Sequence, residues 1–261
     1  MNDRAARTRF LGLGLEILVP IALLAAWAVA SADSESFYFP SLIDIFTTFR
    51  ETWLFARVPT DVLPSLGRLF GGYFIAVAAA VVIGVALGSS DTLRRLVDPV
   101  VHFLRAIPPP VLVPVGILVL GIGSGMKVAL IAFVCFWPIL LNTIDGVAGV
   151  DPSLRETARS FQIPPRERLF RVILPSAAPQ IFAGARISLS LAIIMMVVSE
   201  MVASTNGIGY FVLQSQRVYE ITEMWTGIFL LAILGYVFNT LFLLVERRAL
   251  RWHRGARAGA N

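Results

Sequence analysis

The sequence predicts an all-α membrane protein with six transmembrane helices, and three features indicate this: its composition, the spacing of its charges and the placement of its arginines. Of its 261 residues, 57% are hydrophobic and only 15% are charged, whereas soluble domains are typically about 25% charged and about 45–50% apolar. A soluble globule of this size has too little interior for so much apolar surface. The composition therefore excludes a soluble domain, and a single cysteine excludes a disulfide scaffold.

Stretches without charged residues mark the predicted spans, because a helix needs about 20 residues to cross the hydrocarbon core of a bilayer. Four stretches of 17 to 22 uncharged residues lie at 69–90, 106–126, 128–144 and 224–245. Two further predicted spans contain charges: 10–32 includes Glu16, and roughly 180–203 includes Arg186 and Glu200. Together these stretches make six spans.

The first predicted span has a signal peptide as its alternative. Three arginines precede it, and the small residues at 28–30 resemble a cleavage site. However, the apolar stretch from Phe10 is about 21 residues long, against the usual ~7–15, and it contains Glu16. An uncleaved helix is therefore the better prediction.

The arginines orient the predicted spans. Six spans place fifteen arginines on one side, in both terminal segments and in the loops around 94–95 and 155–171. Because positive charge in short loops favours the cytoplasmic side, both termini are expected there. This bias, which faces anionic membrane lipid, accounts for the net charge of +5 without any nucleic acid.

Two segments on the opposite, outer side have local structure of their own. Residues 41–55 place apolar side chains at helical spacing behind the capping pair Ser41 and Asp44, which predicts an amphipathic helix on the outer surface. Residues 204–223, which include Gln214, begin with turn residues and leave room for a short helix after them.

The longest inner loop, about 148–178, opens with a well-marked helix. Asp151 suits the N-cap, and Pro152 suits the first helical position, where its missing N–H costs nothing. One face of this helix is expected to carry the apolar residues Leu154, Ala158 and Phe161.

A second short helix is expected in the same loop. The proline pair at 164–165 interrupts the first helix, and residues 166–174 then form a helix that ends before Pro175. An ordinary surface loop is the simpler interpretation. Two marked helices exceed what a connection needs, which favours a docking element for a cytoplasmic partner.

Residues 156–175, ETARSFQIPPRERLFRVILP, resemble the EAA loop of binding-protein-dependent ABC transporter permeases. That pattern runs from Glu-Ala-Ala through a glycine to a final Leu-Pro. Residues that match it are Glu156, Ala158, Leu174 and Pro175. Thr157 replaces the middle alanine. Gln162 replaces the glycine, and a left-handed turn there costs a residue with a side chain about 1 kcal/mol or more.

The resemblance extends from about residue 64 to the C-terminus and points to the sulfonate, taurine and nitrate branch of these permeases. It implies a type I ABC importer permease in the bacterial inner membrane that works as a homodimer. Two cytoplasmic ATPases, which hold ATP and Mg, and a periplasmic solute-binding protein complete such systems. The loop residues implied in coupling to the ATPase are Asp151, Leu154, Glu156, Ala158, Arg159, Phe161, Gln162, Leu174 and Pro175.

This chain contains few residues of the kinds that bind nucleotide phosphates, bind metals or form catalytic triads. Its only lysine, Lys127, follows Met126, so there is no G-x-x-x-x-G-K-[ST] phosphate loop. Two histidines and one cysteine give a metal site or a catalytic triad almost no material. Cys135 lies in an apolar run, as a buried structural thiol does. We therefore expect no catalytic residue, no metal and no cofactor in this chain.

Four residues are candidates for the translocation path, namely Pro108, Arg186, Glu200 and Gln214. A charge at mid-bilayer costs about 2.5–3.5 kcal/mol and is by default a functional hypothesis. Arg186 equally suits snorkelling to the inner headgroups, and Glu200 meets either protein or a water-filled vestibule. Pro108 begins either a broken helix entry or a plain helix start.

The cargo expected from the resemblance is a small anion. Lys127 and Arg217 on the outer side and Arg186 toward the inner side would give such an anion a mildly positive route. Glu200 opposes that route, so Glu200→Gln is expected to leave anion uptake intact or faster.

The sequence thus predicts the permease subunit of an ABC importer for a small anion such as a sulfonate, taurine or nitrate. The alternative is a self-contained secondary transporter or channel. That alternative would require inverted repeats and carboxylates at mid-membrane, whereas Asp98 and Asp145 lie at span ends. The predicted parts are a tail and first span at 1–32, a periplasmic segment at 33–64, a permease core at 65–247 with the coupling loop 148–178, and a basic tail at 248–261.

Overall fold

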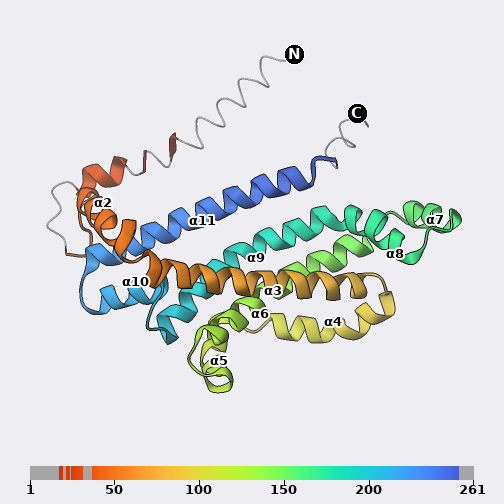
Figure 1. Ribbon diagram of the computed structural model, residues 1–261, viewed down its shortest axis with the longest axis horizontal. Coiled ribbons are helices and arrows are strands. Elements are labelled where there is room, and N and C mark those ends of the chain that lie inside the picture. The colour runs from red at the N-terminus through yellow and green to blue at the C-terminus, as the bar shows by residue number, and fades with distance from the viewer. Residues whose placement is uncertain (1–17, 20–21, 24, 32–36, 253–261) are drawn as a thin grey trace, which may run out of the picture. The chain divides into compact units, whose positions relative to one another are not determined.

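The computed structural model describes residues 18–19, 22–23, 25–31 and 37–252, and the regular structure in these ranges is helical (Figure 1). In chain order the labelled elements are α2 (Leu42–Glu51), η1 (Thr52–Ala56), η2 (Val58–Val62), α3 (Leu63–Gly88), α4 (Asp91–Arg105), η3 (Pro109–Val111), α5 (Leu112–Leu120), α6 (Ser124–Ala148), α7 (Pro152–Ser160), α8 (Pro165–Arg168), η4 (Leu169–Ile173), α9 (Leu174–Ala203), α10 (Ile208–Arg217) and α11 (Ile221–Ala249).

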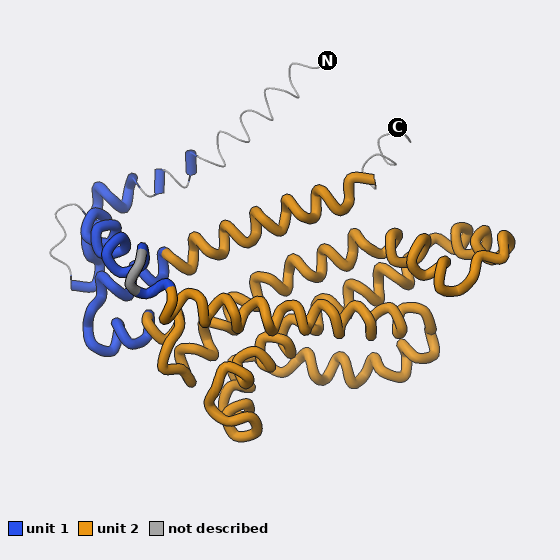
Figure 2. Tube along the Cα trace, in the orientation of Figure 1, with its two compact units in different colours: residues 1–58, 212–229 blue, residues 59–211, 230–261 orange. Residues whose placement is uncertain are grey.

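The chain forms two compact units, which Figure 2 shows in different colours. The first unit contains residues 1–58 and 212–229, and the second contains 59–211 and 230–261. Residues 212–229 are thus grouped with residues 1–58, although the two segments are far apart in the sequence. A division of the chain into consecutive segments does not group them in this way. The division into four consecutive parts stays a prediction.

Helices of spanning length and composition confirm most of the predicted spans. Four stretches of the described chain are long and apolar enough to cross a membrane, namely Val58–Gly88, Ser124–Ala148, Pro165–Ala203 and Ile221–Ala249. The bent pair Asp91–Arg105 and Pro109–Leu120 makes a fifth if it is counted as one span. The predicted first span at 10–32 lies largely outside the described residues.

The uncharged stretch 106–126 does not form one continuous helix, and the structure shows the broken entry that was one of the two alternatives at Pro108. The chain bends by 77° between α4 and the helical segment Pro109–Leu120. α5 has nine residues, a length of only about 14 Å at the helical rise. Three consecutive prolines from Pro108 cause the break, because proline offers no backbone N–H and disfavours helical geometry in the residue before it. Pro108 therefore belongs to a broken entry and not to a plain helix start.

The core of the second unit consists of α3, α6 and α9, which lie side by side in Figure 1. α3 and α6 run parallel, because Gly72 of α3 lies against Ile131 of α6 and Gly84 lies against Thr143. α9 runs antiparallel to α6, with its Gly184 against Pro138 and Asn142. Apolar side chains fill the core, and those without exposed surface include Leu69, Ala80, Ile131, Cys135, Ile139 and Ala192.

Glycines allow α3 and α6 to approach closely, as small residues do in membrane bundles. A Cβ at Gly84 would lie 2.7 Å from the Cβ of Thr143, and one at Gly88 would lie 2.8 Å from the carbonyl oxygen of Ile144. Gly67, in contrast, has nothing within 4 Å of a Cβ. The close approach thus uses Gly72, Gly84 and Gly88 of α3.

The second helix of the inner loop does not end before Pro175, which corrects the prediction. α8, η4 and α9 run on as one helical stretch from Pro165 to Ala203. η4 is a π-helical turn that ends at Ile173, two residues before Pro175, so Pro175 lies inside the continuous stretch. A proline inside a helix lacks the N–H donor and crowds the preceding turn, and the wider π-helical turn accommodates its ring.

The first unit contains the predicted amphipathic helix. Ser41 caps α2: its hydroxyl accepts the backbone N–H of Asp44 at 3.1 Å. The helix buries Ile45 and leaves Phe46 half exposed. In the following turn, Trp53 is buried, and its indole N–H donates to the hydroxyl of Thr226 at 2.9 Å. This bond ties the two chain segments of the unit together.

Candidate functional site

α7, the first helix of the inner loop, starts as the sequence predicts. Asp151 is its N-cap, and the side chain of Asp151 accepts the backbone N–H of Ser153 at 2.8 Å. Hydrogen bonds from Ser153 lower the pKa of Asp151, because they favour the carboxylate form. The cap therefore acts above the ordinary pKa of an aspartate and is lost as the pH falls through the lowered value.

The turn after α7 keeps the left-handed geometry in which the family has glycine. Gln162 has φ 54°. Its N–H donates to Arg159 O at 2.9 Å, and the N–H of Ile163 donates to Ala158 O at 3.0 Å. This pair of bonds is the Schellman motif, which closes a helix through a left-handed residue. The replacement of glycine by Gln162 therefore strains the turn but does not abolish it.

α7 presents its apolar residues in two directions, so the predicted single stripe is only partly correct. Ala158 is buried, while Leu154 is 47% exposed and Phe161 is 77% exposed. Glu156 and Arg159 are also exposed. At the far end of the loop, Leu174 and Pro175 are half-buried at the start of α9. The loop therefore offers a carboxylate and two large apolar side chains to a partner.

Arginines of the same loop border a cavity of about 670 Å³ beside α3. Arg155 also donates to the carbonyl of Val147, which links α7 to the end of α6. The cavity lining, drawn from α3 and from the loop, is Val81, Val82, Val85, Ala86, Ser89, Arg155, Arg159, Pro165, Arg168, Leu169, Phe170, Ile173 and Leu174. It contains three arginines and no acidic residue.

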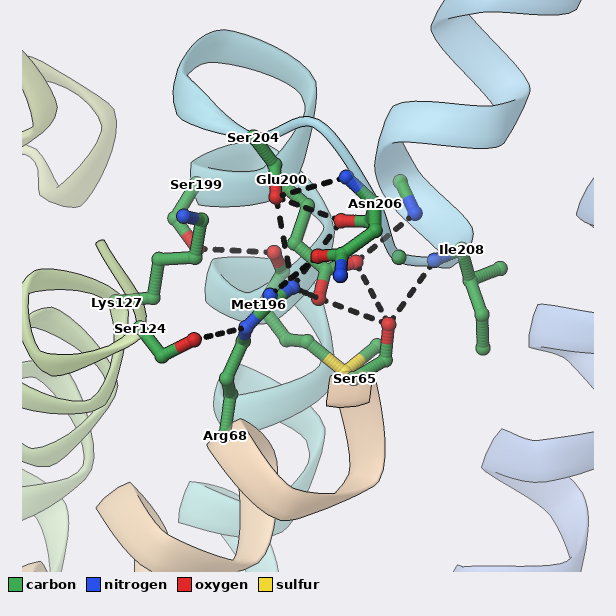
Figure 3. Close-up of polar contacts among 12 residues, drawn as sticks. Ser65, Arg68, Ser124, Lys127, Met196, Ser199, Glu200, Ser204, Asn206 and Ile208 are labelled. Atoms are coloured by element: carbon green, nitrogen blue, oxygen red, sulfur yellow. Dashed lines mark hydrogen bonds and ion pairs between the residues drawn. The ribbon is translucent and has the colours of Figure 1, made fainter. Parts of the chain in front are cut away.

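A buried polar cluster lies at the opposite end of the core, where α3 and α6 begin and α9 ends (Figure 3). Its centre is the carboxylate of Glu200, which has no exposed surface. Arg68 Nη1 donates to Glu200 Oε1 at 2.7 Å, and Ser65 Oγ lies 2.8 and 2.9 Å from the two carboxylate oxygens. The side chain of Arg68 also reaches Ser124 and Asn206.

The same cluster fixes the start of α10. The first backbone N–H groups of a helix have no partner within it, and here side chains from three other elements supply the acceptors. The N–H of Gly207 donates to Asp61 at 2.8 Å, that of Ile208 to Ser65 at 2.9 Å and that of Gly209 to Glu200 at 3.1 Å. Gly207 has φ 115°, and a Cβ there would collide with the carboxylate of Glu200.

Glu200 meets protein in this structure, which is one of the two surroundings expected for it, and its part in the translocation path stays a prediction. Lys127 is corrected: it lies in the first turn of α6 instead of an outer loop, and it is 2% exposed, with Nζ 3.3 Å from Gly123 O. Glu200 and Arg68 form a paired ionic contact between α9 and α3. Breaking such a pair leaves one uncompensated buried charge.

Two of the other path candidates belong to the second unit and lie apart from this cluster. Pro108 lies at the break after α4 and is exposed. Arg186 is exposed on α9; its Nε is 3.3 Å from Asn239 Oδ1, and it borders a cavity of about 490 Å³ that also touches Glu246. The structure therefore does not bring Pro108, Arg186 and Glu200 together as one site. The fourth candidate, Gln214, is an exposed residue of α10 and belongs to the first unit.

Comparison with known proteins gives this arrangement its family. A family model described as "binding-protein-dependent transport system inner membrane component" matches residues 72–251. The chain belongs to this family. The permease has a relative in Bacillus subtilis, the putative aliphatic sulfonates transport permease protein SsuC, which is 30% identical over 90% of this chain and 86% of its own length.

Two further relatives and one solved structure extend the comparison. The taurine transport system permease protein TauC of Escherichia coli is 31% identical over 72% of this chain and 69% of its length. The nitrate import permease protein NrtB of Synechococcus elongatus is 30% identical over 75% of this chain and 74% of its own length. A structure of the MetNI methionine ABC transporter, inward facing, shares the fold with a TM-score of 0.65 at 22% identity, over 72% of this chain and 94% of that one.

These comparisons confirm that the chain is the permease subunit of an ABC importer and a multi-pass membrane protein. The fold class and the branch of relatives also agree with the resemblance carried by the EAA loop. A permease subunit is not itself catalytic, and the described residues contain no group of three or more potential metal ligands.

Sequence patterns do not reveal three residues of the polar cluster around Glu200. Asp61 and Ser65 carry no signal, because neither lies in a recognisable motif. The position of Arg68, directly before the uncharged stretch 69–90, indicates only the border of a span.

Proposed function

We propose that this permease imports a small oxyanion. The observation that carries the proposal is the shared chemistry of its relatives: the proteins similar over most of this chain are named for aliphatic sulfonates, taurine and nitrate. Each of these solutes carries an oxyanion group on a small body. The chain itself has 22 basic and 17 acidic residues, which gives an anion a mildly favourable field.

The inner loop is the proposed coupling element. α7 with Leu154, Glu156 and Phe161 enters a groove of a cytoplasmic ATPase, and two such ATPases hold the ATP and Mg. Burial of one large apolar side chain contributes about 1.5–3 kcal/mol, so Leu154 and Phe161, which are 47% and 77% exposed, are suitable anchors. The Asp151 cap and the Gln162 turn hold α7 at both ends and keep these side chains in place.

The remaining partners follow from the same proposal. A second copy of the permease completes the translocation path as a homodimer, and a periplasmic binding protein delivers the solute. The complex lies in the bacterial inner membrane with both termini in the cytoplasm, where the arginine-rich segments meet anionic lipid. Arg186, exposed on α9, is proposed to belong to the path at its inner end.

Transport by the reconstituted complex tests this function. Proteoliposomes that contain the permease, its ATPase and its binding protein should accumulate labelled taurine or alkanesulfonate only with ATP, and unlabelled small anions should compete. Uptake of a neutral solute without competition by any anion would overturn the substrate class. Uptake that needs no ATP would instead favour a self-contained secondary transporter.

A further inference from the structure

A second cavity lies beside the proline break, between the end of α4, the middle of α6 and α9. Its volume is about 370 Å³, within the range of roughly 300–1,000 Å³ typical of small-molecule sites. The residues that line it are Arg105, Ile107, Pro109, Phe133, Val134, Trp137, Pro138, Leu141, Asn142 and Leu191. Most of the lining is apolar or aromatic, and none of it is acidic.

This cavity lies beside the middle of α6. Trp137 follows the first of the 25 residues of α6 by 13 positions, which is about 20 Å at the helical rise. The opposite wall includes Pro109, the first residue of the short 3-10 helix η3 that follows the break after α4. Broken backbone at membrane depth occurs where it is covered by protein or lines a water-filled cavity.

One polar group of the lining favours an anion. Arg105, in the last turn of α4, brings a permanent positive charge to the cavity. The lining offers no carboxylate that would pair with Arg105. An anion in the cavity would therefore be the counter-ion that the lining itself does not supply.

The rest of the lining suits a short apolar body. Phe133 and Trp137 contact each other edge to face, with ring centroids 5.3 Å apart. Val134, Leu141 and Leu191 complete an apolar wall. Asn142 is turned to its own helix, since its Nδ2 donates to the carbonyl of Pro138 at 2.8 Å. The cavity therefore combines one cation with an aromatic and aliphatic surface.

We propose that this cavity is a binding site within the membrane for the transported anion, with Arg105 as its counter-ion and the aromatic wall of Phe133 and Trp137 against its apolar body. The chemical class that fits is a small monoanion with a short apolar body, such as an alkanesulfonate. This inference rests on the proposed import of a small oxyanion and names the place where the permease itself holds that oxyanion. The broken backbone at Pro108–Pro110 leaves the space that the anion occupies.

Charged thiol reagents test the site without any transport assay. Asn142→Cys, in the full chain with Cys135→Ala and assembled with its ATPase, places a thiol on the lining. The anionic reagent sulfonatoethyl methanethiosulfonate should modify this thiol faster than the cationic trimethylammonioethyl analogue, with the rates normalised to the same pair at the exposed Ser160→Cys. Arg105→Gln should lower the ratio of rates roughly tenfold, the effect of about 1.4 kcal/mol of lost attraction.

A matched control variant distinguishes the effect of a charge at the cavity from the effect of the net charge of α4. Arg95→Gln removes the same charge from the same helix, where Arg95 is exposed and does not line the cavity. Arg95→Gln should leave the ratio of anionic to cationic modification rates unchanged, and Arg105→Lys should retain most of the preference for the anionic reagent. An unchanged ratio in Arg105→Gln, or an equal fall in Arg95→Gln, would overturn the site.

Uptake measurements then distinguish an error in the proposed binding site from an error in the proposed substrate class. In proteoliposomes with labelled methanesulfonate, Arg105→Gln should slow uptake while still co-purifying with the ATPase, and Arg105→Lys should retain most of the uptake. Wild-type uptake by Arg105→Gln would overturn the site and leave anion import standing. Absence of anion uptake by the wild-type complex, together with a charge preference at Asn142→Cys, would overturn the substrate class but not the site.

Discussion

At the scale of the residue, the contact that most constrains this protein is the buried pair of Arg68 and Glu200. The two side chains are 6% and 0% exposed and lie 2.7 Å apart. The paired charges contribute little net stability, since their desolvation offsets their attraction, but either one alone is strongly destabilising. Glu200 also accepts the N–H of Gly209, so the pair holds α3, α9 and the start of α10 in register.

Glu200→Gln should therefore destabilise the permease by about 3–5 kcal/mol, because Arg68 is left as an uncompensated buried charge. Anion uptake by this variant, which the sequence predicts to stay intact or become faster, is a separate measurement. Thermal unfolding of the purified chain in detergent measures the loss. Glu156→Gln, at an exposed site, should leave the unfolding midpoint unchanged, and the double change Arg68→Met with Glu200→Met should restore part of it. A midpoint equal to wild type in Glu200→Gln would contradict this reading.

At the scale of the element, glycines set how closely α3 approaches α6. Gly84→Ala would place a methyl group 2.7 Å from Thr143 Cβ and must push the helices apart. Overpacking of this kind costs about 1–3 kcal/mol. Gly67→Ala in the same helix meets open space and should be neutral or stabilising by up to about 1 kcal/mol. The difference in unfolding midpoint between the two variants measures the effect, and equal midpoints would refute the packing argument.

The turn after α7 gives a second prediction at this scale. Gln162 occupies a left-handed conformation that costs a residue with a side chain about 1–2 kcal/mol. Gln162→Gly removes that cost from the folded state. Glycine also raises the conformational entropy of the unfolded chain, which offsets part of the gain, so a net stabilisation of up to about 1 kcal/mol is expected. Ser160→Gly, within α7 itself, should destabilise instead. Unfolding midpoints of the two variants should thus move in opposite directions.

At the scale of the whole molecule, the orientation of the spans follows from the arginine bias. Cysteines at Ser41 and Gln216 should react with an impermeant thiol reagent in intact cells, while one at Ser160 should not. Cys135 is buried and contributes no background. Labelling at Ser160→Cys without labelling at the other two positions would show that the spans have the opposite orientation.

Coupling to the ATPase is the second prediction at this scale. Glu156→Lys changes the charge of an exposed site on α7 and should impair docking and ATP-driven uptake without altering the unfolding midpoint. Glu167→Lys makes the same charge change in the same loop, where the exposed pair with Arg171 contributes little. Co-purification of the ATPase with each variant is the measurement. Equal docking by both would argue against a coupling role for Glu156.

Features that depend on residues close in sequence followed from the sequence alone. The spanning helices, the Ser41 and Asp151 caps and the inner coupling loop each rest on local hydrophobicity, capping chemistry or a short motif. Family membership followed in the same way, because the EAA pattern lies within twenty consecutive positions. Local signals survive folding when no tertiary contact competes with them.

Only the tertiary structure decided which distant residues meet. Arg68 and Glu200 are 132 positions apart, and no sequence period relates them; their pairing depends on α3 and α9 crossing at one end of α6. The cavity of Arg105 and Trp137 likewise exists because the proline run bends the chain by 77° and returns it against α6. A charge within a span has the same sequence signature whether it lines a path or is neutralised by a partner. Which of the two holds depends on helix packing, a property of the assembled bundle and not of any one segment.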